Sequence, residues 1–134
     1  MTGIVVDTSA WSLALRRQHA QPTSPVVQKL AAVLQDGPPI VLIGIVLQEL
    51  LQGLRSSNQF TRILQALAVF PLVEPIREDY VEAARVRNIC AGKGLQVGTI
   101  DCLIAAMCLQ HDCLLLTADA DFEAIARHTA LRLL

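Results

Sequence analysis

Acidic side chains stand at unusual places among the apolar segments of this chain. Asp7 directly follows a run of Ile and Val, and Asp119 closely follows a run of Leu. Asp101 begins an almost wholly apolar segment, and Glu49 lies in a segment that is otherwise nearly uncharged. No Lys or Arg stands three or four residues from Asp7, Glu49 or Asp101. Since burying an unpaired carboxylate is costly, a divalent cation is the natural partner for these groups.

Carboxylate oxygens are hard ligands of the kind that suit Mg²⁺ or Mn²⁺. A metal held by few protein ligands can polarise a phosphate and activate water for in-line attack. The sequence therefore predicts a catalytic metal site at these acids, with Mg²⁺ as cofactor and Mn²⁺ as a substitute. Without the metal, repulsion among the carboxylates is expected to strain the site.

Each acid also has a purely structural interpretation. Asp7, with the Thr-Ser pair after it, fits an N-cap or an Asx-turn. Asp101 would favour a helix N-terminus through the helix dipole, and Asp119 and Asp121 would cap the last helix. Glu49 would be a solvated residue on a helix edge. For any one acid the structural role is favoured, but the combination is harder to explain that way.

The elements that must position these acids alternate short apolar strands with amphipathic helices. Strands are expected over residues 3–6, 40–42, 72–73, 113–117 and 131–134. Helices are expected over residues 8–17, 25–36, 59–69, 77–90, 100–111 and 119–127, with one more ending near Gly53. Ser24 and Thr99 are expected to cap the helices that follow them, the first with Pro25 in its first helical position.

Strands separated by helices predict parallel pairing. The expected fold is α/β: one domain over residues 1–134, a three-layer α/β/α sandwich around a mainly parallel sheet of about four to five strands. In such sheets ligands bind beyond the carboxyl ends of the strands. Asp7 and Asp119 would both lie at that edge.

The composition limits the class of protein. The net charge of −1 argues against binding nucleic acid through global positive charge. At 53% hydrophobic and 17% charged, the chain has either a large core or a surface that a partner covers. Four cysteines without metal-binding spacing predict buried free thiols and a reducing cytoplasm. No signal peptide is expected, because the N-terminus has no basic stretch followed by a long apolar one. No membrane span is expected either, because the longest apolar run, residues 40–47, is too short.

Four motifs in order along the chain resemble the PIN-domain family, and within it the VapC-type toxins of prokaryotic toxin–antitoxin pairs. The resemblance covers essentially the whole chain. The motifs are Val5-Val6-Asp7-Thr8-Ser9-Ala10-Trp11, Gln48-Glu49-Leu50-Leu51-Gln52-Gly53, Thr99-Ile100-Asp101-Cys102-Leu103-Ile104-Ala105-Ala106, and Leu116-Thr117-Ala118-Asp119-Ala120-Asp121-Phe122. The one departure is Gln48, where many relatives carry a small hydroxyl residue.

The resemblance implies a PIN-like fold and an endoribonuclease that depends on Mg²⁺ or Mn²⁺ and cleaves structured RNA such as transfer or ribosomal RNA. It also implies a homodimer and a cognate antitoxin that wraps and inhibits the toxin. The implied metal ligands and catalytic residues are Asp7, Glu49, Asp101 and Asp119. Asp121 is implied either as a fifth ligand, directly or through water, or as a helix cap. Thr8, Ser9 and Thr117 are implied as residues that position the ligands.

An RNA substrate needs cations around the negative site. The candidates for backbone contacts are Arg16, Arg17, Arg55, Arg87 and Lys93, each of which would also pass as an ordinary surface charge. Three other functions are conceivable for strand-end acids in such a fold. An aspartyl phosphatase would need a second Asp two residues after Asp7, and a receiver module would need a Lys after Thr117; both are absent. A catalytically inactive PIN-like scaffold or protein-binding module remains the alternative.

Overall fold

The computed structural model describes residues 3–15 and 24–134. Helices and strands alternate along the described chain, as the apolar pattern predicts. Their order is β1 (Ile4–Val6), α1 (Thr8–Leu15), α2 (Pro25–Asp36), β2 (Ile40–Ile43), α3 (Gly44–Leu51), α4 (Ser57–Leu67), β3 (Leu72–Val73), α5 (Arg77–Gly92), α6 (Thr99–Gln110), β4 (Leu114–Leu116) and α7 (Ala120–His128). The expected end of the first helix near residue 17 lies outside the described residues.

The strands form one parallel sheet in the order β3-β2-β1-β4. In β1, Ile4 pairs with Ile40 of β2 and with Leu114 of β4. Every residue of β1 is buried, as expected for an inner parallel strand of β-branched side chains covered on both faces. The predicted α/β fold with a mainly parallel sheet is confirmed.

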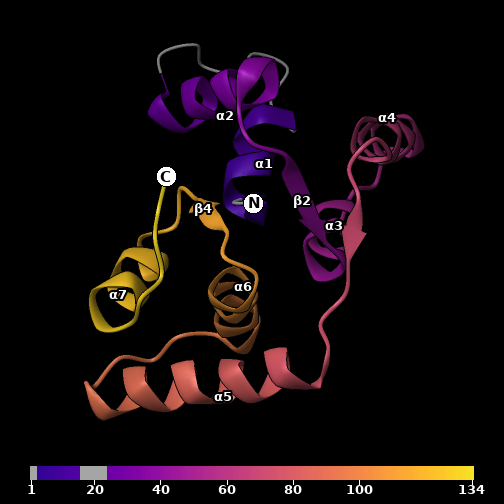
Figure 1. The fold of residues 1–134 in the computed structure, drawn as a ribbon. Coiled ribbons are helices and arrows are strands. Elements are labelled where there is room, and N and C mark those ends of the chain that lie inside the picture. The colour runs from indigo at the N-terminus through magenta and orange to yellow at the C-terminus, as the bar shows by residue number, and fades with distance from the viewer. Residues whose placement is uncertain (1–2, 16–23) are drawn as a thin grey trace.

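Helices cover the sheet in two layers. Figure 1 shows α5, α6 and α7 on one side of the strands, and α1 and α2 on the other. Helix α1 also packs on α3, which packs on α4, while α5 packs along α6. Because strands and helices alternate, all four strands run the same way and their carboxyl ends meet at one edge. That edge receives the residues that follow β1, β2, β3 and β4.

Two local expectations were wrong. Residues 131–134 form no strand; a single parallel bridge joins Leu133 to Leu115, because the chain runs beside β4 for one residue pair only. Thr99 is the first residue of α6 and does not cap it; the N-cap position belongs to Gly98. A third expectation is confirmed, because Ser24 occupies the N-cap position of α2 and Pro25 follows in the first turn. The Ser24 side chain makes no capping hydrogen bond, so the fixed backbone of Pro25 is what favours the start of that helix.

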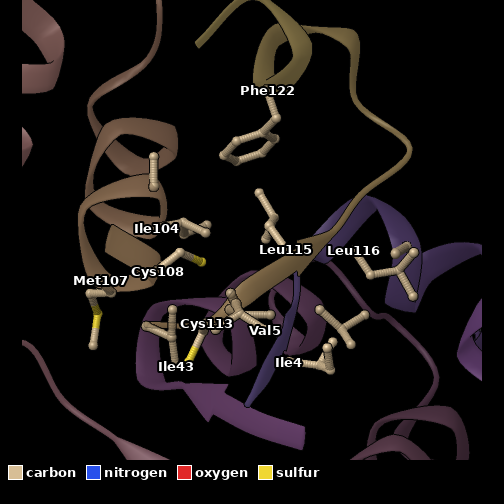
Figure 2. Packing of buried hydrophobic residues seen from close by; sticks show 14 of the residues in the cluster. Ile4, Val5, Ile43, Ile104, Met107, Cys108, Cys113, Leu115, Leu116 and Phe122 are labelled. Atoms are coloured by element: carbon tan, nitrogen blue, oxygen red, sulfur yellow. The ribbon is translucent and has the colours of Figure 1, made fainter. Parts of the chain in front are cut away.

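The core extends to both faces of the sheet, and one part of it lies between the sheet and α6. Figure 2 shows Ile104 and Cys108 of α6 and Phe122 of α7 gathered around Leu115 of β4. Trp11, on the other layer, is also buried and packs its ring against Phe70. All four cysteines are buried and free, as the sequence predicts. Among the described helices, none is long and apolar enough to cross a membrane.

Asp79 is a buried acid that the sequence pattern did not single out. Its carboxylate is 1% exposed. Oδ2 accepts the backbone N–H of Ile76 at 2.9 Å, which caps the start of α5. Oδ1 lies 3.2 Å from Nε2 of His111, the residue that ends α6. This pair of contacts ties the beginning of α5 to the end of α6, the helix that carries Asp101.

We expect Asp79→Ala to lower the free energy of unfolding by about 2 kcal/mol, combining a lost helix cap with a second lost buried hydrogen bond. Urea denaturation followed by circular dichroism would measure the change. Glu78→Ala is the matched control, since Glu78 is exposed in the same turn and should matter by about 0.5 kcal/mol or less. Equal losses in the two variants would contradict this role for Asp79.

Candidate metal centre

Asp7 follows β1 and is held by three hydrogen bonds, although it is only 4% exposed. Its Oδ1 accepts the hydroxyl of Ser9 at 2.7 Å and the backbone N–H of Ala10 at 3.0 Å. Its Oδ2 accepts the hydroxyl of Thr117 at 2.8 Å. Burial raises the pKa of Asp7, the hydrogen bonds oppose that rise, and the nearby charge of Asp119 adds to it.

Ser9 and Thr117 join the loops that follow β1 and β4. Besides donating to Asp7, Ser9 Oγ accepts the N–H of Ala118 at 2.9 Å, and Thr117 Oγ1 accepts the N–H of Asp119 at 2.9 Å. Each hydroxyl has one proton and gives it to Asp7, so the 3.3 Å contact between the two hydroxyl oxygens carries no proton. The two side chains therefore fix Asp7 relative to the loop that carries Asp119.

Replacing Thr117 by Val should leave one buried oxygen of Asp7 unsatisfied at nearly constant side-chain volume. We expect a loss of about 1–3 kcal/mol in unfolding free energy and a fall in Mn²⁺ affinity of about 10–100-fold. Thermal unfolding and Mn²⁺ titration calorimetry would measure the two effects. Thr117→Ser keeps the hydroxyl and should restore both; failure of Ser to restore them would show that the methyl group, and not the hydrogen bond, matters.

Glu49 lies on α3, where it is tied to α1. The hydroxyl of Thr8 donates to its Oε1 at 2.8 Å, joining residues 41 positions apart in the chain. Glu49 is only partly exposed, so the interpretation as a freely solvated residue on a helix edge does not describe it. Thr8 therefore holds Glu49 much as Ser9 and Thr117 hold Asp7.

The other three acids gather at the starts of α6 and α7. Asp119 is the N-cap of α7, where its Oδ1 accepts the N–H of Asp121 at 2.9 Å. Asp101, Asp119 and Asp121 each offer one carboxylate oxygen, and these oxygens lie within 4.8 Å of one another. The cap is made by the side chain of Asp119, so the carboxylate of Asp121 is left at the cluster and does not cap the helix.

Asp101 shows how the acids act on one another. Its pKa is raised from 3.8 to about 6, first by burial and then by surrounding negative charges. Those charges, in decreasing order of effect, are Asp119, Asp121, Asp7 and Glu49. All five acids that the sequence singles out thus converge on one edge of the sheet, and a cation there would relieve their repulsion.

The donor set fits a hard divalent cation. Asp101, Asp119 and Asp121 contribute only carboxylate oxygens, which Mg²⁺ and Mn²⁺ prefer over nitrogen or sulfur. Two of the three are partly buried and one is exposed, so the cluster is open on one side to solvent or substrate. An open position is what a catalytic metal site needs.

The predicted RNA-contacting cations differ in their surroundings. Two of the five lie outside the described residues: Arg16 and Arg17. Arg55 and Lys93 are exposed, the second at the end of α5. Arg87 donates from its Nη1 to the backbone oxygen of Val97 at 2.8 Å, in the segment that leads into α6. This bond gives Arg87 a structural role in positioning that segment.

Two residues near this edge were missed or misjudged from the sequence. Glu74 directly follows β3, and the same strand-end rule that singled out Asp7 would have found it. Tyr80, an aromatic residue of the helix expected over residues 77–90, is 55% exposed and is not part of the buried face of α5. The buried face of α5 instead includes Asp79, whose hydrogen bonds replace the apolar contacts that the pattern predicts.

The fold is a parallel sheet layered by helices. Acidic residues lie at the carboxyl edge of its strands. A family model of the PIN domain matches residues 4–128. Since the match spans nearly the whole chain, the chain belongs to the PIN domain family.

Within that family the sequence is similar to VapC ribonucleases. Ribonuclease VapC11 of Mycobacterium tuberculosis is 30% identical over 133 residues, 96% of each chain. The VapBC2 structure from Rickettsia felis, bound to a promoter DNA fragment, has a TM-score of 0.76 at 19% identity, covering 99% of this chain and 98% of that one. VapC20 of Mycobacterium tuberculosis, a Sarcin-Ricin loop cleaving toxin, has a TM-score of 0.66 at 18% identity, covering 96% and 98%.

Proposed function

We propose that this chain is a Mg²⁺-dependent endoribonuclease, with Mn²⁺ as a substitute, that hydrolyses phosphodiester bonds in structured RNA and acts as the toxin of a toxin–antitoxin pair. The observation that carries the proposal is the acidic cluster in which carboxylate oxygens of Asp101, Asp119 and Asp121 lie within 4.8 Å of one another. Asp7 and Glu49 add to the negative charge around Asp101. The similarity to a VapC ribonuclease supports RNA as substrate. The sarcin–ricin loop cleaved by VapC20 supports a structured loop of ribosomal or transfer RNA as the target class.

Asp101, Asp119 and Asp121 would hold the metal, with Asp7 and Glu49 beside them. When bound, Mg²⁺ neutralises the carboxylates and polarises the scissile phosphate. The chain's own part is to keep the acids in place: Ser9 and Thr117 orient Asp7, and Thr8 orients Glu49. These groups are held before the substrate arrives, so little reorganisation is needed at the moment of reaction.

Cations on the surface would hold the RNA backbone beside the acids. Arg55 and Lys93 are exposed and suited to phosphate contacts. The net charge of −1 means that binding should depend on such local contacts and weaken with added salt.

The proposed partners are a cognate antitoxin and a second copy of this chain. Large apolar side chains remain exposed on several helices of the described chain, among them Leu34, Leu64, Val81 and Ile89. Clusters of exposed apolar groups mark protein interfaces. The fold shared with the VapBC2 complex supports an antitoxin as one partner that covers such surface.

The test incubates the purified chain, freed of any antitoxin, with total cellular RNA and Mg²⁺ or Mn²⁺. Discrete fragments are expected, and they should vanish with EDTA and with Asp7→Asn. Lys29→Gln is the control variant and should cleave normally, because the Lys29 side chain donates to the backbone oxygen of Leu134 and is not part of the acidic cluster. If the folded protein binds no Mn²⁺ in calorimetry and cleaves no RNA, the inactive scaffold replaces the nuclease as the better account.

A further inference from the structure

A cleft of about 330 Å³ opens beside the acidic edge. Gln48 and Thr99 line it, and each is close in the chain to a proposed ligand: Gln48 precedes Glu49, and Thr99 stands two residues before Asp101. The far wall comes from the segment after β3 and from Tyr80 of α5. A group bound in this cleft would therefore contact chain neighbours of the proposed ligands Glu49 and Asp101, although these two acids do not line the cleft themselves.

Glu74 places a carboxylate in the wall of the cleft. The carboxylate lies directly over Gly44, where any Cβ would overlap Oε1. Within residues 3–15 and 24–134, no hydrogen bond or ion pair is recorded for this exposed side chain. The N-terminus of α3 carries a partial positive charge, which stabilises the nearby carboxylate of Glu74. The oxygens of this carboxylate can still accept hydrogen bonds from a ligand.

Tyr80 and Gln48 add an aromatic surface and an amide group to the carboxylate of Glu74 in the cleft wall. Tyr80 exposes more than half of an aromatic side chain at the cleft, a surface on which a nucleobase can stack. Gln48 is exposed and carries an amide that both donates and accepts.

We propose that this cleft binds one unpaired nucleobase next to the scissile phosphate and that it prefers guanine. The proposal rests on the proposed ribonuclease function and specifies its substrate. Guanine presents two adjacent donors, N1–H and the N2 amino group, which match the two oxygens of Glu74. Its O6 accepts from the amide of Gln48. Adenine and cytosine place an acceptor where guanine places N1–H, so the carboxylate would repel them.

The first experiment needs no catalysis. Guanosine, inosine and adenosine 5′-monophosphates are titrated into ¹⁵N-labelled protein with Mg²⁺, and amide shifts are followed. The guanine nucleotide should shift Gly44 and the side-chain amide of Gln48. Inosine lacks the N2 amino group and should bind about tenfold more weakly, and adenine more weakly still. The shared phosphate cancels in these comparisons, so the differences report the base.

Glu74→Gln should remove the difference between guanine and inosine, because the amide supplies only one acceptor. Glu78→Gln removes an exposed acid that does not line the cleft, and it should keep the difference. Tyr80→Ala should weaken all three nucleotides by a similar factor of about tenfold, since stacking does not distinguish bases. A purely capping role for Glu74 would change thermal stability without changing base preference.

Equal binding of the guanine and adenine nucleotides, or shifts confined to other parts of the chain, would overturn the proposal. So would a Tyr80→Ala variant that changes from dimer to monomer in sedimentation while its nucleotide binding is unchanged, because the cleft wall would then be a contact between copies. If RNA is never cleaved but guanine binding is as expected, the nuclease proposal fails and the base site stands. If RNA is cleaved but the guanine nucleotide does not bind in this way, the nuclease proposal stands and the base site fails.

Discussion

Replacing Asp101 by Asn is expected to reduce RNA cleavage by about 10²–10³-fold and, in the same protein, to increase stability at pH 7 in the absence of metal. A metal contributes several kcal/mol of charge stabilisation in the transition state, and about 1.4 kcal/mol corresponds to a factor of ten in rate. The gain in stability arises because the Asn variant removes a carboxylate that is unfavourable in the folded protein without metal. The pKa of Asp101 is raised to about 6 by burial and by four other acids, so the folded protein is destabilised when Asp101 is ionised.

The sign of the pH dependence follows from that shift. A carboxyl whose pKa is higher in the folded than in the unfolded state disfavours folding above its folded pKa. This penalty is full above about pH 6 and disappears as the pH falls toward 3.8. Since Asp101 is only half-buried, solvent screening reduces the expected gain of the Asn variant at pH 7 to about 1–2 kcal/mol.

Urea denaturation in EDTA at pH 7 and at pH 4.5 would measure the gain, which should shrink at the lower pH. Asp36→Asn removes an exposed acid at the end of α2 and serves as the control, with little effect on stability or cleavage. An Asp101→Asn protein that is less stable than the parent at pH 7 would show that this acid is part of a stabilising network and not of a strained cluster.

The second large effect is expected from Phe122→Ala. Phe122 is fully buried and packs near Leu115 and Ile104, which fixes α7 against the core (Figure 2). Truncating a buried Phe costs about 3–5 kcal/mol, a large share of the roughly 5–15 kcal/mol that stabilises a typical domain. Because α7 begins next to Asp119 and contains Asp121, a loosened helix should also weaken Mn²⁺ binding in the protein that remains folded.

Phe60→Ala provides the matched comparison. Phe60 lies on α4 and is 39% exposed, so the same truncation leaves no internal cavity. We expect it to change the unfolding free energy by less than about 1 kcal/mol. Thermal unfolding gives the stability of both variants, and calorimetry at a temperature where both are folded gives Mn²⁺ affinity. Similar losses in the two variants would mean that Phe122 does not anchor α7.

The sequence by itself determined the parallel sheet and the edge at which the acids meet. Strands separated by helices must run parallel, and residues such as Asp7, placed directly after a strand, must then reach the carboxyl edge. The nearly uncharged setting of Glu49 and Asp101 also follows from the sequence. Secondary structure and strand direction depend on local patterns along the chain, and such patterns can be identified in the sequence alone.

Only the tertiary structure decided which side chains meet. Asp121 joins Asp101 and Asp119 in the acidic cluster, because the side chain of Asp119 takes the capping role that the sequence left open for either Asp119 or Asp121. The contact between Asp79 and His111 joins residues 32 positions apart. Tyr80 is exposed because of how α5 is rotated on α6, and no periodicity in the chain fixes that rotation. Such contacts depend on packing between elements that are distant in the sequence. They form only when the helices are packed against the sheet.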